Sequence, residues 1–518
     1  MSWEEEVREI ERRQELVLEM GGPELVEQEH AGGKLTVRER IDGLLDSDSF
    51  EEQGRLAGTG VYEDGELKSF HPSGVVLGAG RIDGRRVIVT GSDYTARRAP
   101  PNRDRPRPKG GYAEQMALEM KVPLIKLIDA FGANIRAIEQ MSRTYIPEMP
   151  GWWMNHALMA EVPVVAAALG SVAGGPAAEA AATHFTVMVR GNSQIFAAGP
   201  PVVIRALGLE VTKEELGGAD VHARGSGLAD NEAESEADAL QQIRRFLSYL
   251  PSNVYQVPPI DPEPDDTPDR RDEELLSIVP RDRQRPYDVR QLVEHIVDRG
   301  SAFEIGRYFG GSQITMFARM DGRPIGVLAN DPRVLGGSMD AASAEKFTKF
   351  VDLCDAFNLP IVNFADQPGF MIGPSAERAG TLKKGVRALA AIYDASVPWA
   401  TVVVRRLYGV AGAAHQSHHR HAFRIAWPSG EWGSIPIEGG VMAAYRRQIE
   451  NAPDPDAERA RIEQEFVAVR NPLRGAEAFD IEDLIDPRDT RPVLCNWVRD
   501  AYERLPLVAG KKSHHMRP

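Results

Sequence analysis

Two short segments rich in glycine and alanine carry the residue types in this sequence that best suit chemistry at an oxyanion. Each follows an apolar run that begins at a Val-Pro pair, at residues 162–163 and again at 397–398. The first run leads to Ala-Gly-Gly at 173–175, and the second to Tyr-Gly-Val-Ala-Gly-Ala at 408–413. A turn of this kind before a helix presents backbone N–H groups that no side chain covers, and such groups stabilise developing negative charge. The segments therefore predict two oxyanion sites, with close helix–strand packing as the alternative for each.

The composition sets limits on the class of protein. The 518 residues are 42% hydrophobic and 26% charged, as expected for a globular chain with at least two domains. No apolar run of 18 residues occurs and the acidic N-terminus is unlike a signal peptide, so we expect a cytoplasmic protein without a membrane span. The net charge of -15 argues against general nucleic-acid binding. Two cysteines, Cys354 and Cys495, are too few for a disulfide framework.

The elements that must position the two turns alternate between apolar runs and helical stretches. The strand candidates are Val75–Ala79, Val87–Thr90, Leu124–Ile128, Val162–Leu169 and Thr186–Val189. The helix candidates between them are Tyr112–Met120 and Ile135–Gln140. Residues 1–30 are typical of a charged helix that lies on the surface or against a neighbouring subunit. Thr36 with Glu39 has the spacing of a capping box. The alternation predicts an α/β fold.

These elements occur twice, in the same order. Residues 81–85 (Arg-Ile-Asp-Gly-Arg) are echoed by 319–323 (Arg-Met-Asp-Gly-Arg), and the strand at 124–129 is echoed by 360–366. The Val-Pro strands and their turns follow, with matched positions 235 to 238 residues apart. Four matches in order predict a tandem duplication. We expect an N-terminal domain at 1–258, a linker rich in Pro, Asp and Arg at 259–285, and a C-terminal domain at 286–518.

Further segments carry a resemblance to a known family. They are 32–42, 216–219 with His222 and 225–227, 246–251, 326–330, 366–370, 426–428 and 485–491. Their order and spacing together resemble the carboxyltransferase (β) subunits of biotin-dependent acyl-CoA carboxylases, the propionyl-CoA and acetyl-CoA carboxylase β-chain family. The resemblance implies two tandem crotonase-like (ββα spiral) domains, which agrees with the duplication.

The resemblance also implies a function. The chain would move CO2 from carboxybiotin on a separate carrier protein to the α-carbon of an acyl-CoA, through an enolate held at an oxyanion site. The acyl-CoA thioester would lie at the first turn and biotin at the second. The implied catalytic residues are Gly174, Gly175, Gly409, Val410, Ala411 and Gly412. The implied neighbours of the two cofactors are Gly132, Ala133, Ala173, Tyr408 and Ala413.

The sequence departs from the family at three places. The second turn lacks the acidic residue of the propionyl-CoA type, with Ala413 in its place, so we expect a different acyl pocket. Phe131 replaces a glycine of the family, and it either lines the acyl-CoA channel or packs in the core. A basic loop replaces a neutral one, and it either grips the CoA phosphates or is a plain surface loop. Its candidate phosphate ligands are Arg97, Arg98, Arg103, Arg105, Arg107 and Lys109.

The histidines His415, His418, His419 and His421 have a spacing that permits a metal site. No carboxylate lies within a turn of them and the family uses no metal, so we expect none. The histidines would instead line the biotin side of the site or contact a neighbouring subunit. Met120-Lys121 lacks the context of a biotin acceptor, so the biotin must be carried by another chain.

The resemblance implies a biotin carboxylase, a biotin carboxyl carrier and a homo-hexameric core as partners. Three other functions stay open. The same oxyanion sites would serve a decarboxylase that hands CO2 from an acyl-CoA to biotin. The altered second turn would also suit a non-catalytic assembly scaffold. A crotonase-type hydratase or isomerase would normally need one domain and positioned glutamates. The acyl-CoA that is used cannot be predicted.

Overall fold

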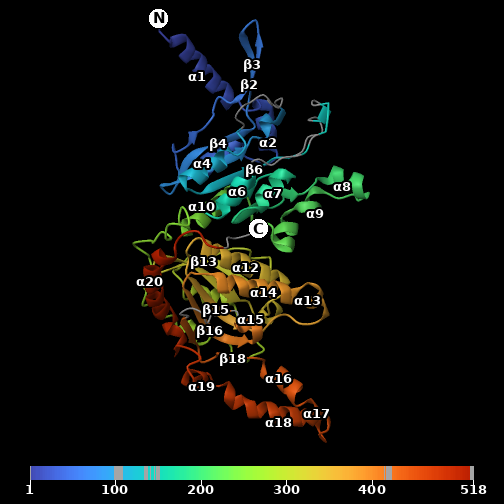
Figure 1. Ribbon diagram of the computed structural model, residues 1–518, viewed down its shortest axis with the longest axis vertical. Helices are drawn as coiled ribbons and strands as arrows, with labels where there is room; N and C mark the ends of the chain where they lie inside the picture. The colour runs from blue at the N-terminus through green and yellow to red at the C-terminus, as the bar shows by residue number, and fades with distance from the viewer. Residues whose placement is uncertain are drawn as a thin grey trace. The chain divides into compact units, whose positions relative to one another are not determined.

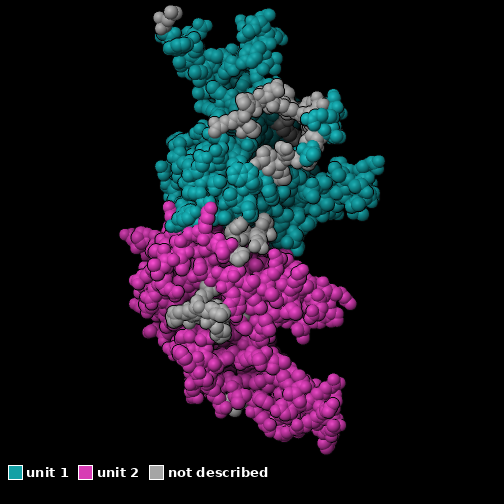
Figure 2. Space-filling view, in the orientation of Figure 1, with its two compact units in different colours: residues 1–248, 252–255, 515–518 teal, residues 249–251, 256–514 magenta. Residues whose placement is uncertain are grey.

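The computed structural model describes residues 2–98, 109–132, 138–139, 142–144, 146, 152–413, 415 and 423–513. They form two compact units, of which unit 1 holds 1–248 and 252–255, and unit 2 holds 249–251 and 256–514 (Figures 1 and 2). The expected domain boundaries stay a prediction. The stretch 259–285 belongs to unit 2 by its contacts, and Leu275 is buried in the core of that unit.

The main sheet of unit 1 has seven strands in the order β1-β4-β5-β6-β7-β9-β11. The pairs among β1, β4 and β5 are antiparallel, and the neighbours from β5 onward are parallel. The strands are β1 Glu51–Glu52, β4 Val75–Ile82, β5 Arg85–Ser92, β6 Leu124–Ile128, β7 Val164–Ala168, β9 Phe185–Val189 and β11 Asn231–Ala233. β6, β7 and β9 are buried along their whole length, as parallel strands covered on both faces must be. All five strand predictions are confirmed.

The main sheet of unit 2 repeats this order as β12-β13-β14-β15-β16-β17-β19, with β18 beside β16. Its strands are β12 Phe303–Glu304, β13 Gln313–Met320, β14 Arg323–Asn330, β15 Ile361–Gln367, β16 Trp399–Tyr408, β17 Phe423–Ala426, β18 Glu431–Gly433 and β19 Asp483–Leu484. The directions also repeat, antiparallel up to β14 and parallel beyond it. The predicted α/β duplication is therefore confirmed.

The halves differ in one strand. In unit 1, β8 (Ser171–Ala173) pairs with β10 (Gln194–Phe196) as a separate parallel pair. In unit 2, the equivalent of β7 and β8 is the single strand β16, whose end pairs with β18. A further hairpin of β2 (Gly58–Glu63) and β3 (Glu66–Pro72) lies outside the main sheet of unit 1.

Helices cover both sheets (Figure 1). In the N-terminal half they are α1 Glu4–Leu18, α2 Pro23–Ala31, α3 Val37–Leu44, α4 Tyr112–Met120, α6 Trp152–Met159, α7 Gly175–Ala181, α8 Pro200–Leu207, α9 Lys213–Gly217 and α10 Glu236–Tyr249, with the short 3-10 turn η1 Thr95–Arg98 and the π-helix η2 Asp220–Ser226. In the C-terminal half the helices are α11 Val289–Glu294, α12 Ala341–Ala356, α13 Pro374–Arg378, α14 Thr381–Asp394, α15 Gly409–Ala413, α16 Ile437–Ala444, α17 Arg446–Glu450, α18 Pro455–Val467, α19 Pro472–Glu477 and α20 Thr490–Val508. The short turns there are η3 Glu273–Leu276, η4 Leu335–Gly337, η5 Ala468–Arg470 and η6 Pro487–Asp489.

Two helix predictions are confirmed and one is wrong. The range of α4 is the expected one, and Thr36 and Glu39 form both bonds of the capping box of α3. The single helix expected over 1–30 is instead broken into α1 and α2. Gly21 donates its N–H to Thr95 Oγ1 at 3.0 Å, and a Cβ on Gly21 would stand 2.4 Å from the Thr95 carbonyl oxygen. Gly22 then has φ 96°, outside the helical region, so the chain turns there. The helix expected at 135–140 lies outside the described residues but for 138–139.

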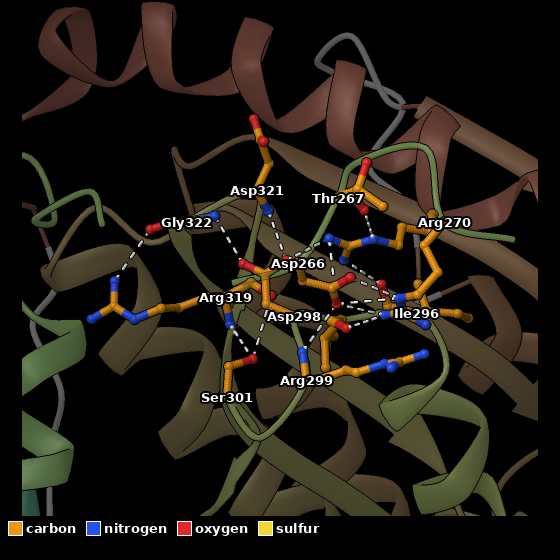
Figure 3. A network of polar contacts seen from close by, with 12 residues as sticks. Asp266, Thr267, Arg270, Ile296, Asp298, Arg299, Ser301, Arg319, Asp321 and Gly322 are labelled. Carbon is orange, nitrogen blue, oxygen red and sulfur yellow. Dashed lines mark hydrogen bonds and ion pairs between the residues drawn. The ribbon is translucent and has the colours of Figure 1, made fainter. Parts of the chain in front are cut away.

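The Asp-Gly tips of the hairpins β4–β5 and β13–β14 confirm the repeat in detail. Asp83 and Gly84 have φ 50° and 76°, and Asp321 and Gly322 have φ 53° and 73°, as a type I′ turn requires. In unit 2, the Asp298 carboxylate accepts from both tip amides (Figure 3). Buried Arg491 donates to the same carboxylate at 2.8 Å.

None of the described helices is long and apolar enough to span a membrane.

Candidate active site

The first glycine-rich turn joins β8 to α7. Gly174 has φ 68°, a conformation that costs glycine little and other residues much more. Its N–H donates to the Phe196 carbonyl at 3.3 Å, which ties the turn to β10. Gly175 opens α7 and its amide has no partner within the helix, because the first amides of a helix never do. Of the two glycines expected to serve an oxyanion, Gly175 is thus the one with an amide left to donate.

Gly132 packs against this turn. A Cβ on Gly132 would stand 2.7 Å from the Gly175 nitrogen and 2.9 Å from Pro176 Cδ, so only glycine fits. The Gly132 N–H donates to the Ala173 carbonyl at 2.9 Å, and the Ala173 N–H donates to the Ala130 carbonyl at 3.2 Å. Gly132 and Ala173, both expected near a cofactor, therefore meet at one place. Ala133 lies outside the described residues.

Phe131 is bridged to Ala173, so the two side chains point to the same side of this short ladder. The residue is 46% exposed, and its ring makes an edge contact with Tyr94, with ring centroids 6.2 Å apart. The alternative of simple core packing is therefore wrong for Phe131, because nearly half of the residue faces solvent in unit 1.

The second turn has the same backbone form. Gly409 has φ 64°, follows Tyr408 at the end of β16 and opens α15. Tyr408 pairs with Gly433 of β18, as Ala173 pairs with Phe196 in unit 1. Val410 is 56% exposed, whereas Ala411 and Gly412 are buried. A Cβ on Gly412 would stand 2.9 Å from the Leu407 carbonyl carbon, so this glycine packs the helix on the strand. Ala413 is exposed.

Charged groups surround the Tyr408 side chain. Burial, and next the Glu431 carboxylate, raise the pKa of Tyr408 to about 12, so the phenol keeps its proton at neutral pH. Glu431 is paired with Arg283, and Glu438 with Arg470. These pairs place two positive and two negative side chains beside the second turn, with Glu431 and Arg470 the more buried member of each pair. No sequence pattern indicates this group of residues, because its members come from four separate segments.

The basic loop is only partly described. Lys109 donates to the Val75 carbonyl at 2.9 Å, so this candidate phosphate ligand braces β4. Arg97 belongs to the turn η1, which begins at Thr95. The positions of the other candidates in the loop, Arg103, Arg105 and Arg107, lie outside the described residues, and of Arg97 and Arg98 only the backbone within η1 is described.

His415 is a core residue and not a surface ligand. It is fully buried, its Nδ1 lies 2.7 Å from Asn363 Nδ2, and its ring meets Phe347 edge-on. Burial lowers its pKa to about 4. The expected place at the biotin side or at a subunit contact is thus wrong for His415, since β15 and α12 enclose it. His418, His419 and His421 lie outside the described residues. Among the residues that are described, no group of three or more His, Cys, Asp or Glu could hold a metal ion.

Comparison with known proteins agrees with the fold described above. The family model described as carboxyl transferase domain matches residues 28–514. A propionyl-CoA carboxylase carboxyltransferase subunit of Haloferax mediterranei is 36% identical, with 95% of each chain covered. A methylmalonyl-CoA decarboxylase subunit alpha of Veillonella parvula is 34% identical, with 95% of this chain and 94% of the relative covered.

A solved structure extends the match to three dimensions. The crystal structure of transcarboxylase 12S, described as a hexamer assembly with methylmalonyl-coenzyme A bound, superposes with a TM-score of 0.86. It is 31% identical, and the alignment covers 100% of this chain and 98% of that one. The crotonase-like fold that the resemblance implied is thus confirmed. This chain is an enzyme, and it belongs to the carboxyl transferase family of the biotin-dependent acyl-CoA carboxylases.

Proposed function

We propose that this chain transfers a carboxyl group between biotin on a separate carrier and the α-carbon of an acyl-CoA, with one turn for each oxyanion. The observation that carries the proposal is the equivalence of Gly174 and Gly409. Both have φ between 60° and 70°, both follow a strand with a short parallel partner, and each stands at the N-terminal end of a helix. Carboxyl transfer between these partners creates negative charge on two different oxygens, so two donor sites match its needs.

Unit 1 is assigned to the thioester and unit 2 to biotin. At the first turn, the Gly175 amide would donate to the thioester oxygen, with Gly132 leaving the approach open. At the second, the amides that open α15 at Gly409 and Val410 would donate to the ureido oxygen of biotin. Exposed Val410 supports this, because it lies on the accessible side of α15. The buried Ala411 and Gly412 would shape the turn and not touch biotin.

Propionyl-CoA and methylmalonyl-CoA are the first substrate pair to test, because the names of the relatives contain one or the other. The direction of transfer is open, since carboxylases and decarboxylases are similarly related to this chain. A hexameric core, a biotin carboxylase partner and a cytoplasmic location stay part of the proposal, as do the domain boundaries 1–258 and 286–518.

The experiment is transfer of labelled carboxyl from a carboxybiotin-loaded carrier to a panel of acyl-CoAs, followed in both directions. We expect one or a few thioesters to become labelled. A folded protein that transfers to none of them would contradict the proposal and favour a scaffold.

Two variants locate the chemistry. Gly174→Val blocks the approach to the first turn and should abolish transfer while the assembly forms. Gly191→Ala is the control, because Gly191 has nearly the same φ, 69°, with open space around it. Retained turnover in Gly174→Val would place the thioester elsewhere.

A further inference from the structure

We propose that two equivalent buried aspartates, Asp366 and Asp129, are positioning residues that each set the direction of one catalytic turn. The inference deepens the proposed function and rests on its assignment of the turns. Each aspartate lies at the end of the fourth strand of its sheet, on β15 and directly after β6. Both are almost completely buried, with 0% and 1% of the residue exposed.

The strand that leads to the turn is irregular beside each aspartate. In unit 2, Ala365 pairs with Val403 but Gln367 pairs with Leu407, so three residues of β16 lie opposite Asp366 alone. In unit 1, Ile128 pairs with Ala168 but Phe131 pairs with Ala173, which again leaves two extra residues on the strand before the turn. A bulge of this kind re-aims the strand that follows it. The bulges end one and two residues before Gly174 and Gly409.

The Asp366 carboxylate holds the bulge of unit 2. One oxygen accepts from the Arg406 backbone N–H at 3.3 Å and from its Nε at 2.6 Å. The other accepts from Arg405 Nε and Nη2 at 3.0 and 2.9 Å. The carboxylate therefore accepts one backbone N–H of the bulge and pairs with both of its guanidinium groups.

The two arginines extend this hold to neighbouring loops. Arg406 Nη2 donates to the Gly336 carbonyl at 2.7 Å, and Arg405 Nη1 donates to the Arg285 carbonyl at 3.0 Å. Gly336 follows Leu335, whose φ of 49° is strained for a leucine. Arg405 thereby also fixes the backbone that presents Arg283 to Glu431, beside Tyr408.

Asp129 is linked to the bulge of unit 1 through cations that come from elsewhere in the chain. Its Oδ2 accepts from Lys34 Nζ at 2.9 Å and lies 3.6 Å from Arg40 Nη2. That Arg40 nitrogen also donates to the Leu169 carbonyl at 3.0 Å, which belongs to the bulge. The other oxygen, Oδ1, has no hydrogen-bond partner among the described residues and faces the Cα of Gly170. A Cβ at Gly170 would stand 2.1 Å from it, so the bulge is fitted around the carboxylate.

The test uses Asp366→Asn and Asp129→Asn in the full-length chain. The control is Asp298→Asn, which also breaks a buried pair in unit 2 but lies at the hairpin tip, at the opposite ends of the parallel strands. Transfer from methylmalonyl-CoA to free biotin gives a kcat/KM for each substrate. We expect Asp366→Asn to lower kcat/KM for biotin by about tenfold or more with the KM for methylmalonyl-CoA unchanged. Asp129→Asn should instead lower kcat/KM for methylmalonyl-CoA and leave the KM for biotin unchanged. Asp298→Asn should change neither kcat/KM value.

Amide hydrogen exchange is the second readout, and it does not depend on activity. Asp366→Asn should speed exchange at 409–412, and Asp129→Asn at 174–178. Equal effects of Asp366→Asn and Asp298→Asn on both readouts would overturn the proposal. Local exchange without the kinetic split would support positioning but contradict the assignment of substrates to turns. If Asp366→Asn does not fold, Arg406→Gln, which cuts the link to Gly336 at a partly exposed side chain, carries the same expectation.

Discussion

Asp46 and Asp298 occupy equivalent places in the two units, and each carboxylate accepts hydrogen bonds from both amides at the tip of a hairpin. Asp46 binds Asp83 N and Gly84 N at 3.0 and 2.8 Å, and Asp298 binds Asp321 N and Gly322 N at the same distances. Each also pairs with one arginine, Arg244 or Arg491. The surroundings differ, because the Asp46 side chain is 30% exposed and the Asp298 side chain 8%.

This difference predicts unequal costs. Asp298→Ala should lower the free energy of unfolding by about 3 kcal/mol or more, because it leaves the buried Arg491 without its nearest partner. Asp46→Ala should cost clearly less, because water can solvate Arg244. Urea unfolding of both variants, followed by tryptophan fluorescence, measures the two costs. Equal costs would mean that burial of the pair contributes nothing.

Gly132→Ala should impair the first turn without unfolding the chain. The new Cβ would push the Gly175 nitrogen and Pro176 away, so we expect kcat/KM for the acyl-CoA to fall by about tenfold or more. Gly74→Ala is the control, because the nearest atom to its Cβ would be 3.8 Å away. Steady-state kinetics with the acyl-CoA varied is the measurement, and an unchanged kcat/KM would show that the turn tolerates the shift.

His415 should make unit 2 sensitive to acid. Its pKa is about 4 in the folded chain against 6.5 as the ordinary value, so between these pH values the unfolded chain binds more protons. Stability contributed by neutral His415 is thus present above pH 6.5 and is lost as the pH falls toward 4, by roughly 3 kcal/mol. His415→Gln should show a shallower loss over this window in urea unfolding at several pH values. A parallel loss in both proteins would contradict the assignment.

Lys346 should make the free energy of unfolding depend on pH in the alkaline range. Burial lowers its pKa to about 7, from 10.5, and its Nζ donates to the Gly306 carbonyl at 2.9 Å. Between these pH values the unfolded chain holds the extra proton, so stability should rise with pH there, by roughly 5 kcal/mol in all. Lys346→Met should flatten this rise. Thermal unfolding at pH 7 and pH 10 tests it, and an equal rise in the variant would assign the effect to other groups.

Local patterns predicted much of the fold. An Asp-Gly pair, as at 83–84 and 321–322, commonly forms a type I′ hairpin turn. An apolar run, such as those after the two Val-Pro pairs, commonly forms a buried strand of a parallel sheet. The residues Gly21-Gly22-Pro23 are a helix-breaking signal, but the apolar residues on both sides are too sparse to indicate two separate helices. Local signals suffice where a few neighbouring residues decide the backbone.

The site was less predictable because it depends on residues far apart in the chain. Nothing near Asp129 indicates that Lys34, 95 residues away, will neutralise it. The engagement of the Gly174 amide by Phe196 depends on how β10 pairs, and the burial of His415 depends on α12. The glycines could be found from sequence, but which amide is left to donate could not.

The separate pairing of β8 with β10 has a consequence for local unfolding. Two three-residue strands can part without disturbing the main sheet of unit 1, whereas the end of β16 cannot leave β18 without loosening a strand of ten residues. The first turn should therefore sample open states at a lower free-energy cost than the second. A thioester that arrives and departs freely suits the looser half, and a tethered biotin that returns in every cycle suits the firmer one.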